Sequence, residues 1–169
     1  MPSGIKKSTG ADLSALLEGL AEAGVEFILV GGLAAVVQGS PVTTMDVDIV
    51  HNRSSGNITR LIGFLKSIGA VYRRPDDKVI EPTEIDLSEM GHMLFTTRLG
   101  PVDVLAFIEE RKVYEDLLEH TVEIPFRGHI IRVLDLEMLI ELKRMSRDPK
   151  DWQRLPVLEE TLRQLYQRK

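Results

Sequence analysis

The sequence predicts a mixed α/β (α+β) fold, in which helices flank a mixed β-sheet. In the first half of the chain, short apolar segments typical of strands alternate with segments whose apolar residues recur at helical spacing. In the second half, strand-like segments come in pairs joined by short turns that contain glycine, which favours hairpins. Strands that alternate with helices and then pair with their neighbours form a sheet with helices packed against it.

Length and composition narrow the class of protein. The chain has 169 residues, a net charge of −5 and no cysteine. We expect a flexible N-terminal tail over residues 1–10 and a single domain over residues 11–169 that ends in helices. The absence of cysteine excludes disulfides and thiolate zinc sites, and the acidic charge argues against a general nucleic-acid binder. Because no apolar run reaches membrane-spanning length, we expect a cytoplasmic protein without a membrane partner.

The first elements follow from periodicity and from residues that begin and end helices. Apolar residues at helical spacing predict a helix over residues 13–20, which Asp12 caps and Gly24 ends. A buried strand is expected over residues 26–30. A short apolar helix is expected over residues 33–38.

The middle of the chain is less regular. Residues 45–50 predict a second strand, and residues 58–68 predict an amphipathic helix that ends at Gly69. In the polar stretch that follows, we expect a loop over residues 73–78. We also expect a short edge strand within residues 80–92, interrupted by Pro82.

The second half predicts two hairpins and three helices. One hairpin joins residues 93–97 to residues 102–107, and the other turns at Gly128. The helices are expected over residues 109–119, from Asp135 to about residue 145, and from Pro156 toward residue 166.

Gly31 and Gly32 stand between the first strand and the helix that follows it. Glycine lets the backbone approach a ligand closely, and the start of a helix offers free N–H groups to a phosphate. A strand-to-helix turn also uses glycine for its geometry alone. The pair by itself is therefore weak evidence for a binding site.

Asp46 and Asp48 are separated by one residue in the second predicted strand. Alternation along a strand places both carboxylates on the same face, where they repel each other unless a cation offsets the repulsion. Because Val47 and Ile49 are apolar, we expect the strand to be buried, and unpaired acids are unfavourable there. Oxygen ligands at this spacing suit Mg²⁺. His51, which follows directly, is expected to be an ordinary exposed histidine.

Asp103 is the one charged residue in the apolar stretch GPVDVLAFI. An aspartate inside an apolar strand is more often a ligand or a hydrogen-bonding group than a chance occurrence. If its strand lies beside that of Asp46 and Asp48, the three acids form a cluster that can hold two cations. The alternative, a structural domain with coincidental acids, stays open at this point.

The order of these features resembles a known family. A strand, two glycines, a short helix, Gly39-Ser40, the pair Asp46-x-Asp48 and a later strand with one aspartate together resemble the nucleotidyltransferase superfamily of the DNA polymerase β type. The local pattern is most similar to the small bacterial AbiEii/MenT-type toxins and to aminoglycoside nucleotidyltransferase-like proteins. The resemblance covers about residues 12–155. It implies a nucleotidyltransferase-like fold.

The resemblance also implies roles for individual residues. Asp46, Asp48 and Asp103 would be the catalytic acids and would bind Mg²⁺ (or Mn²⁺), and one of them would help to activate an acceptor hydroxyl. The segment LIELKRMSRDPKDWQRL is similar to the end of the family, in which a lysine on a helix reaches the triphosphate. The implied nucleotide-binding residues are Gly31, Gly32, Ser40, Thr44 and Lys143.

The implied function is transfer of a nucleoside monophosphate from a nucleoside triphosphate (NTP) to an acceptor hydroxyl of an RNA such as tRNA, a protein or a small molecule. Many relatives carry an arginine at the position of Val42, so this chain lacks one phosphate contact. The difference favours an alternative, a catalytically inactive nucleotide-binding or partner-binding protein, as in a toxin–antitoxin pair. A partner protein or a homodimer fits either alternative. Residues 73–91 are expected to contribute to the choice of acceptor.

Overall fold

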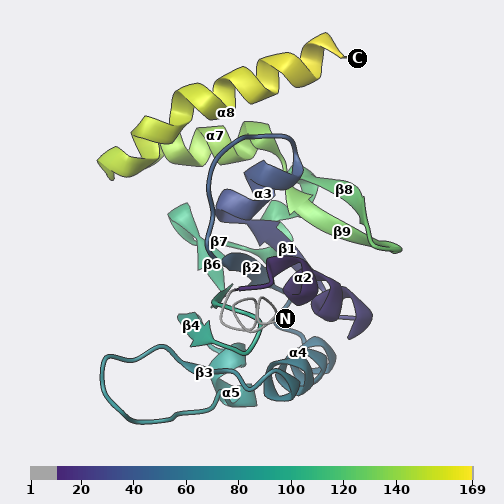
Figure 1. Cartoon of the computed structure of the whole chain (residues 1–169), viewed down its shortest axis with the longest axis vertical. Helices are drawn as coiled ribbons and strands as arrows, with labels where there is room; N and C mark the ends of the chain where they lie inside the picture. Colours follow the sequence, from purple (N-terminus) through teal and green to yellow (C-terminus); the bar gives the residue numbers. More distant parts are fainter. Residues whose placement is uncertain (1–10, 169) are drawn as a thin grey trace, which may run out of the picture.

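The computed structural model describes residues 11–168 and contains a seven-stranded mixed sheet with helices on both faces (Figure 1). This confirms the predicted fold class. The expected tail over residues 1–10 lies outside the described residues, and the single-domain division stays a prediction. Within the described part of the chain, no helix has both the length and the apolar character needed to cross a membrane.

The sheet places its best-buried strands at the centre. In spatial order its strands are β3 (Val71–Tyr72), β4 (His92–Thr96), β5 (Val102–Leu105), β2 (Val47–His51), β1 (Phe27–Val30), β9 (His129–Leu134) and β8 (Thr121–Phe126). β1 and β2 are antiparallel, whereas β5 runs parallel to β2 and β9 runs parallel to β1. All four residues of β1 are buried, because helices cover both of its faces.

Two groups of helices enclose the sheet. The helices α2 (Leu13–Glu22) and α4 (Ser55–Ser67) contact each other on one face. On the other face, α3 (Gly31–Val37) packs on β1 and β2 and contacts α7 (Leu136–Met145). The last helix, α8 (Pro149–Gln167), lies on the outer side of α7 (Figure 1).

Several local predictions are confirmed. The Asp12 side chain accepts a hydrogen bond from the Ala15 N–H at 3.0 Å and so caps α2. The hairpin of β8 and β9 turns at Arg127 and Gly128, both of which have positive φ angles. Asp135 caps α7 by accepting a hydrogen bond from the Met138 N–H at 2.8 Å. Each of these signals acts over a few residues, so the local sequence is sufficient to set them.

The edge strand expected within residues 80–92 is wrong. Helix α5 (Glu84–Ser88) occupies the middle of this stretch. Thr83 accepts a hydrogen bond from the Asp86 N–H, and the Asp86 side chain accepts one from the Thr83 N–H. This reciprocal capping box begins a helix, and its pattern outweighs the strand-like Ile80 and Ile85.

The helix expected over residues 109–119 is broken. Glu110 and Arg111 have φ angles of 60° and 56°, which no helix of L-residues can continue. The chain turns back there, so that β7 (Lys112–Val113) pairs with β6 (Phe107–Ile108). The helical remainder is the short α6 (Tyr114–Leu117) between two 3-10 turns, Glu109–Arg111 and Leu118–His120.

The last helix begins earlier than expected. It starts at Pro149 rather than Pro156, because Asp148 caps it and accepts a hydrogen bond from the Lys150 N–H at 2.9 Å. Proline at the first helical position has no N–H to leave unpaired. Pro156 lies inside the helix, where the helix loses one hydrogen bond but continues.

Candidate active site

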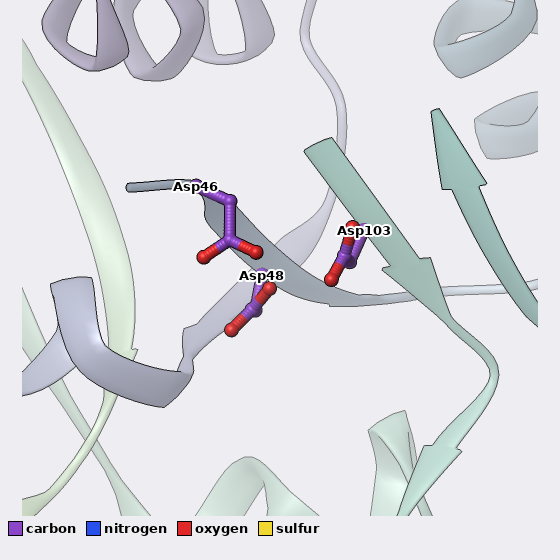
Figure 2. A group of neighbouring side chains, drawn as sticks. All are labelled: Asp46, Asp48 and Asp103. Atoms are coloured by element: carbon purple, nitrogen blue, oxygen red, sulfur yellow. The ribbon is translucent and has the colours of Figure 1, made fainter. Parts of the chain in front are cut away.

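The three predicted acids converge on one face of the sheet. β2 and β5 run parallel with Asp48 directly beside Asp103, and Asp46 precedes β2 by one residue. One carboxylate oxygen from each of the three side chains lies within 4.8 Å of the other two (Figure 2). The predicted convergence is therefore confirmed. The observed strand starts two residues later than predicted, since β2 begins at Val47 rather than at Met45.

The turn between β1 and α3 lies against Asp48. Gly31 has a φ angle of +72°, and a Cβ atom at this position would lie 2.2 Å from Asp48 Oδ2. An alanine would therefore be strained in its backbone and would collide with the carboxylate. Only glycine lets the turn and the acid occupy this place together.

The loop that follows α3 folds back over the same turn. A Cβ atom at Gly32 would lie 3.1 Å from Thr44 Oγ1, and that hydroxyl donates a hydrogen bond to the Asp46 carbonyl oxygen at 3.3 Å. Thr44 thus connects the second glycine to the first acid. The structure brings Gly31, Gly32 and Thr44 together with the acids.

Lys143 of α7 faces the same space. A cavity of about 170 Å³ is lined by Lys143, Gly31, Asp48 and Glu109, together with apolar residues of the surrounding strands and helices. The Lys143 ammonium lies 2.9 Å from Asp151 Oδ1, and the Ser146 hydroxyl donates to Asp151 Oδ2 at 2.5 Å. Asp151 therefore holds the lysine side chain at the edge of the site.

Ser40 stands apart from this group. It lies just beyond the end of α3 that is farther from Gly31, where its N–H donates to the Ala35 carbonyl oxygen at 3.0 Å. The side chain is 4% exposed, and its Oγ has no hydrogen-bond partner in the described part of the chain. Its predicted contact with the nucleotide stays a prediction.

The electrostatics of the cluster favour a bound cation. Burial, followed by the charges of Asp46 and Asp103, raises the pKa of Asp48 to about 8. Burial, followed by the charge of Asp103, also raises the pKa of Asp46. Asp48 Oδ1 is buried and has no hydrogen-bond partner among the described residues. Three carboxylates with an unpartnered oxygen form a donor set that fits a hard divalent cation such as Mg²⁺ or Mn²⁺.

Sequence reasoning missed Arg73. Its Nη2 lies 3.0 Å from Asp103 Oδ1 and 3.0 Å from the Phe95 carbonyl oxygen. Arg73 follows β3, a two-residue strand that its own sequence does not predict, and only the pairing of β3 with β4 brings the guanidinium to the acids. The residue belongs to the polar stretch 73–91 that was expected to influence the acceptor.

His51 is not the exposed histidine that was expected. It is 0% exposed and lies on the face of β2 opposite to Asp48. Its Nε2 is 2.7 Å from the Leu87 carbonyl oxygen, and its Nδ1 is 3.3 Å from the Leu105 carbonyl oxygen. Burial lowers the pKa of His51, so the neutral ring donates through Nε2 in the shorter contact. The residue joins α5 to the sheet.

Two solved structures have a similar fold. One is the lincosamide antibiotic adenylyltransferase LnuA with lincomycin bound, at 14% identity and a TM-score of 0.57, with 87% of this chain and 94% of that chain covered. The other is ANT(2″)-Ia in complex with adenylyl-2″-tobramycin, at 14% identity and a TM-score of 0.53, with 86% of this chain and 84% of that chain covered. At these identities the likeness concerns the fold. No curated protein matched the chain.

A family model decides the class of the protein. Residues 9–168 match the family described as nucleotidyl transferase of unknown function (DUF2204). The match includes the glycine turn, the three clustered acids and the C-terminal helices. The chain is therefore a member of the DUF2204 nucleotidyl transferase family.

Proposed function

We propose that this protein is a divalent-metal-dependent enzyme that transfers a nucleoside monophosphate from an NTP to an acceptor hydroxyl. The observation that carries the proposal is the cluster of Asp46, Asp48 and Asp103 beside the glycine turn. Family membership supports the reaction class. The metal, the donor nucleotide and the acceptor are the parts that this proposal adds.

The three aspartates would hold Mg²⁺ or Mn²⁺. A bound cation would supply positive charge to the reacting phosphate and lower the pKa of the attacking hydroxyl. The unpartnered Oδ1 of Asp48 and its raised pKa support this assignment, since both indicate a carboxylate that lacks a positive partner.

The remaining residues would bind and orient the nucleotide. Lys143 provides a point charge for the triphosphate at the edge of the cavity that it shares with Asp48. Gly31 and Gly32 leave room for the phosphates to approach the backbone, and Thr44 and Ser40 complete the proposed binding set. The acceptor oxygen attacks the α-phosphorus, the bond from that phosphorus to the bridging oxygen breaks, and pyrophosphate leaves. The hydroxyl proton passes to a carboxylate of the cluster.

A small molecule is the first acceptor class to test. The two similar solved structures contain lincomycin and adenylyl-2″-tobramycin, which are small hydroxyl-bearing compounds. A tRNA and a protein hydroxyl are the other two classes that suit the same chemistry. Because the donor is an NTP, we place the reaction in the cytoplasm.

The test uses NTPs labelled at the α-phosphate, with Mg²⁺ or Mn²⁺. The acceptors are a panel of aminoglycosides and lincosamides, total tRNA, and cell proteins that include the enzyme itself. We expect label transfer and pyrophosphate release with one class of acceptor, and loss of both in Asp48→Asn. Failure of the protein to bind any NTP in calorimetry, with no transfer to any acceptor, would reject the proposal.

A second candidate is a nucleotide-binding or partner-binding protein without catalysis, for example one member of a toxin–antitoxin pair. One observation favours it: Arg73 forms an ion pair with Asp103, so one of the three acids already has a positive partner. The resemblance to the family, in which many members carry an arginine at the position of Val42, points the same way. NTP binding without pyrophosphate release across the whole acceptor panel would select this candidate.

A further inference from the structure

We propose that Arg154 of α8 binds the triphosphate of the NTP. This inference rests on the proposed nucleotide site and assigns one more residue to it. It follows from the position of the guanidinium, from its unused donors and from the place of Val42 in the same loop.

The Arg154 side chain reaches from α8 to the loop over residues 38–46. Its Nη2 donates a hydrogen bond to the Thr43 carbonyl oxygen at 3.3 Å, across 111 residues of sequence. Its Nη1 lies 3.3 Å from where a Cβ atom of Gly32 would stand. The loop that joins α3 to β2 arches toward α7 and α8 in Figure 1, so this contact spans two separate layers of the molecule. The guanidinium therefore stands beside the second glycine of the turn.

Two cations then flank the glycine turn. Lys143 shares a cavity with Gly31 and Asp48, whereas Arg154 lies beside Gly32. Both come from the C-terminal helices, although the turn belongs to the first strand and helix of the sheet. A triphosphate bound to a metal at the acids would extend from the α-phosphate toward one or both of these cations.

The two cations differ in how their donors are used. Lys143 is already paired with Asp151 at 2.9 Å. Arg154 is exposed and, within residues 11–168, forms no direct ion pair; its charge interacts with Asp151 at longer range, and its hydrogen bond goes to one main-chain carbonyl oxygen. A guanidinium has five N–H donors in a fork that matches phosphate oxygens, so most of its donors are available to a ligand.

Val42 supplies no cation to this loop. Val42 is half-buried and packs against the core, so it offers the loop nothing that can contact a phosphate. Thr43, the next residue, is the one that Arg154 contacts. The cation beside this loop is therefore supplied by α8 and not by a residue of the loop.

The test compares ligands that differ only in their number of phosphates. Calorimetry with Mg²⁺ measures the dissociation constants of an NTP and of the matching nucleoside monophosphate for the unchanged protein and for Arg154→Ala. We expect the affinity for the NTP to fall by about ten- to a hundredfold, which at about 1.4 kcal/mol per factor of ten is about 1.4 to 2.8 kcal/mol. The affinity for the monophosphate should change by less than about threefold, because it lacks the β- and γ-phosphates.

Two further variants separate this role from simpler ones. Arg163→Ala removes the same charge from an exposed position of α8, where Arg163 pairs with Glu160, and should leave NTP binding unchanged. Arg154→Lys keeps the charge but loses the fork, and should recover part of the lost NTP affinity. If Arg154 only held the loop in place, Arg154→Ala would lower NTP and monophosphate affinity equally and would lower the melting temperature.

That equal loss would overturn the inference, and so would NTP binding that Arg154→Ala leaves intact. The failure of the proposed function has a different signature. If the unchanged protein binds no NTP at all, both proposals are overturned. If the unchanged protein binds NTP and the Arg154 variants bind it as tightly as Arg163→Ala does, the proposed function stands and this inference alone is wrong.

Discussion

The buried polar groups on the two faces of β2 differ in whether the protein supplies hydrogen-bond partners for them. On one face, His51 is completely buried, and both of its ring nitrogens lie near main-chain carbonyl oxygens of other elements. On the other face, Asp48 has a buried oxygen with no hydrogen-bond partner in the described part of the chain, and two more acids lie beside it. The same five-residue strand therefore carries a histidine that hydrogen-bonds to the protein and a carboxylate oxygen that does not.

This difference separates folding from function. A buried polar group that is satisfied internally stabilises one arrangement of the chain, as His51 does for α5 and the sheet. A buried carboxylate without a partner destabilises the fold, and such an arrangement persists where a ligand completes it. The comparison predicts that changes on the two faces have opposite effects on stability and activity.

The largest expected effect is on catalysis, in Asp48→Asn. The substitution removes one charge and one ligand from the proposed metal site, so turnover should fall by about a thousandfold or more. The free energy of unfolding without metal should be unchanged or higher, because asparagine avoids the cost of burying an ionisable carboxyl beside two others. Pyrophosphate release and urea unfolding measure the two quantities. An unfolded Asp48→Asn protein would contradict the comparison.

The next effect is on stability, in His51→Ala. The loss of the ring leaves the Leu87 carbonyl oxygen buried without its donor and opens a cavity, so we expect a loss of about 2 to 4 kcal/mol in the free energy of unfolding. His92→Ala, which changes an exposed histidine on β4, is the matched control and should lose less than about 1 kcal/mol. Urea unfolding decides between them, and equal losses would show that His51 has no special structural role.

A pH dependence should follow from Asp48. Its pKa is about 8 in the folded protein and near the ordinary value of 3.8 in the unfolded chain, so the folded state holds a proton that the unfolded state releases. The stability of the metal-free protein should therefore fall as the pH rises from about 4 to 8, by about 1.4 kcal/mol for each pH unit. Urea midpoints measured with a chelator between pH 5 and 9 should show the decline. Asp48→Asn should lack this part of the decline, and saturating Mg²⁺ should reduce it.

The smallest expected effect concerns nucleotide binding, in Lys143→Ala. Removal of one point charge from the edge of the site should weaken NTP binding by about tenfold. The fold should change little, because the pair with Asp151 is partly exposed and alanine suits a helix. Lys66→Ala removes an exposed lysine from α4 and is the control for net charge. Equal NTP dissociation constants for the two variants would remove Lys143 from the site.

Local sequence determined the features of this protein that depend on side-chain alternation along a strand or on a few neighbouring residues. Alternation along a strand placed Asp46 and Asp48 on one face, and the glycine pair marked the turn that Asp48 touches. The capping box of Thr83 and Asp86 was equally readable, and the edge strand proposed there failed because that signal was overlooked. The positive φ angles of Glu110 and Arg111 left no such mark, since the pairing of β7 with β6 imposes them.

Tertiary structure decided which distant residues meet. The pairing of β2 with β5 brought Asp103 to Asp48, and the pairing of β3 with β4 brought Arg73 to Asp103. The packing of α8 on α7 placed Arg154 in contact with Thr43, in the loop that contains Val42. A one-dimensional pattern fixes the face on which a side chain lies, because that depends on a repeat of two or of 3.6 residues. It does not fix the neighbour across a sheet or between helices, because that depends on how the whole chain buries its apolar surface.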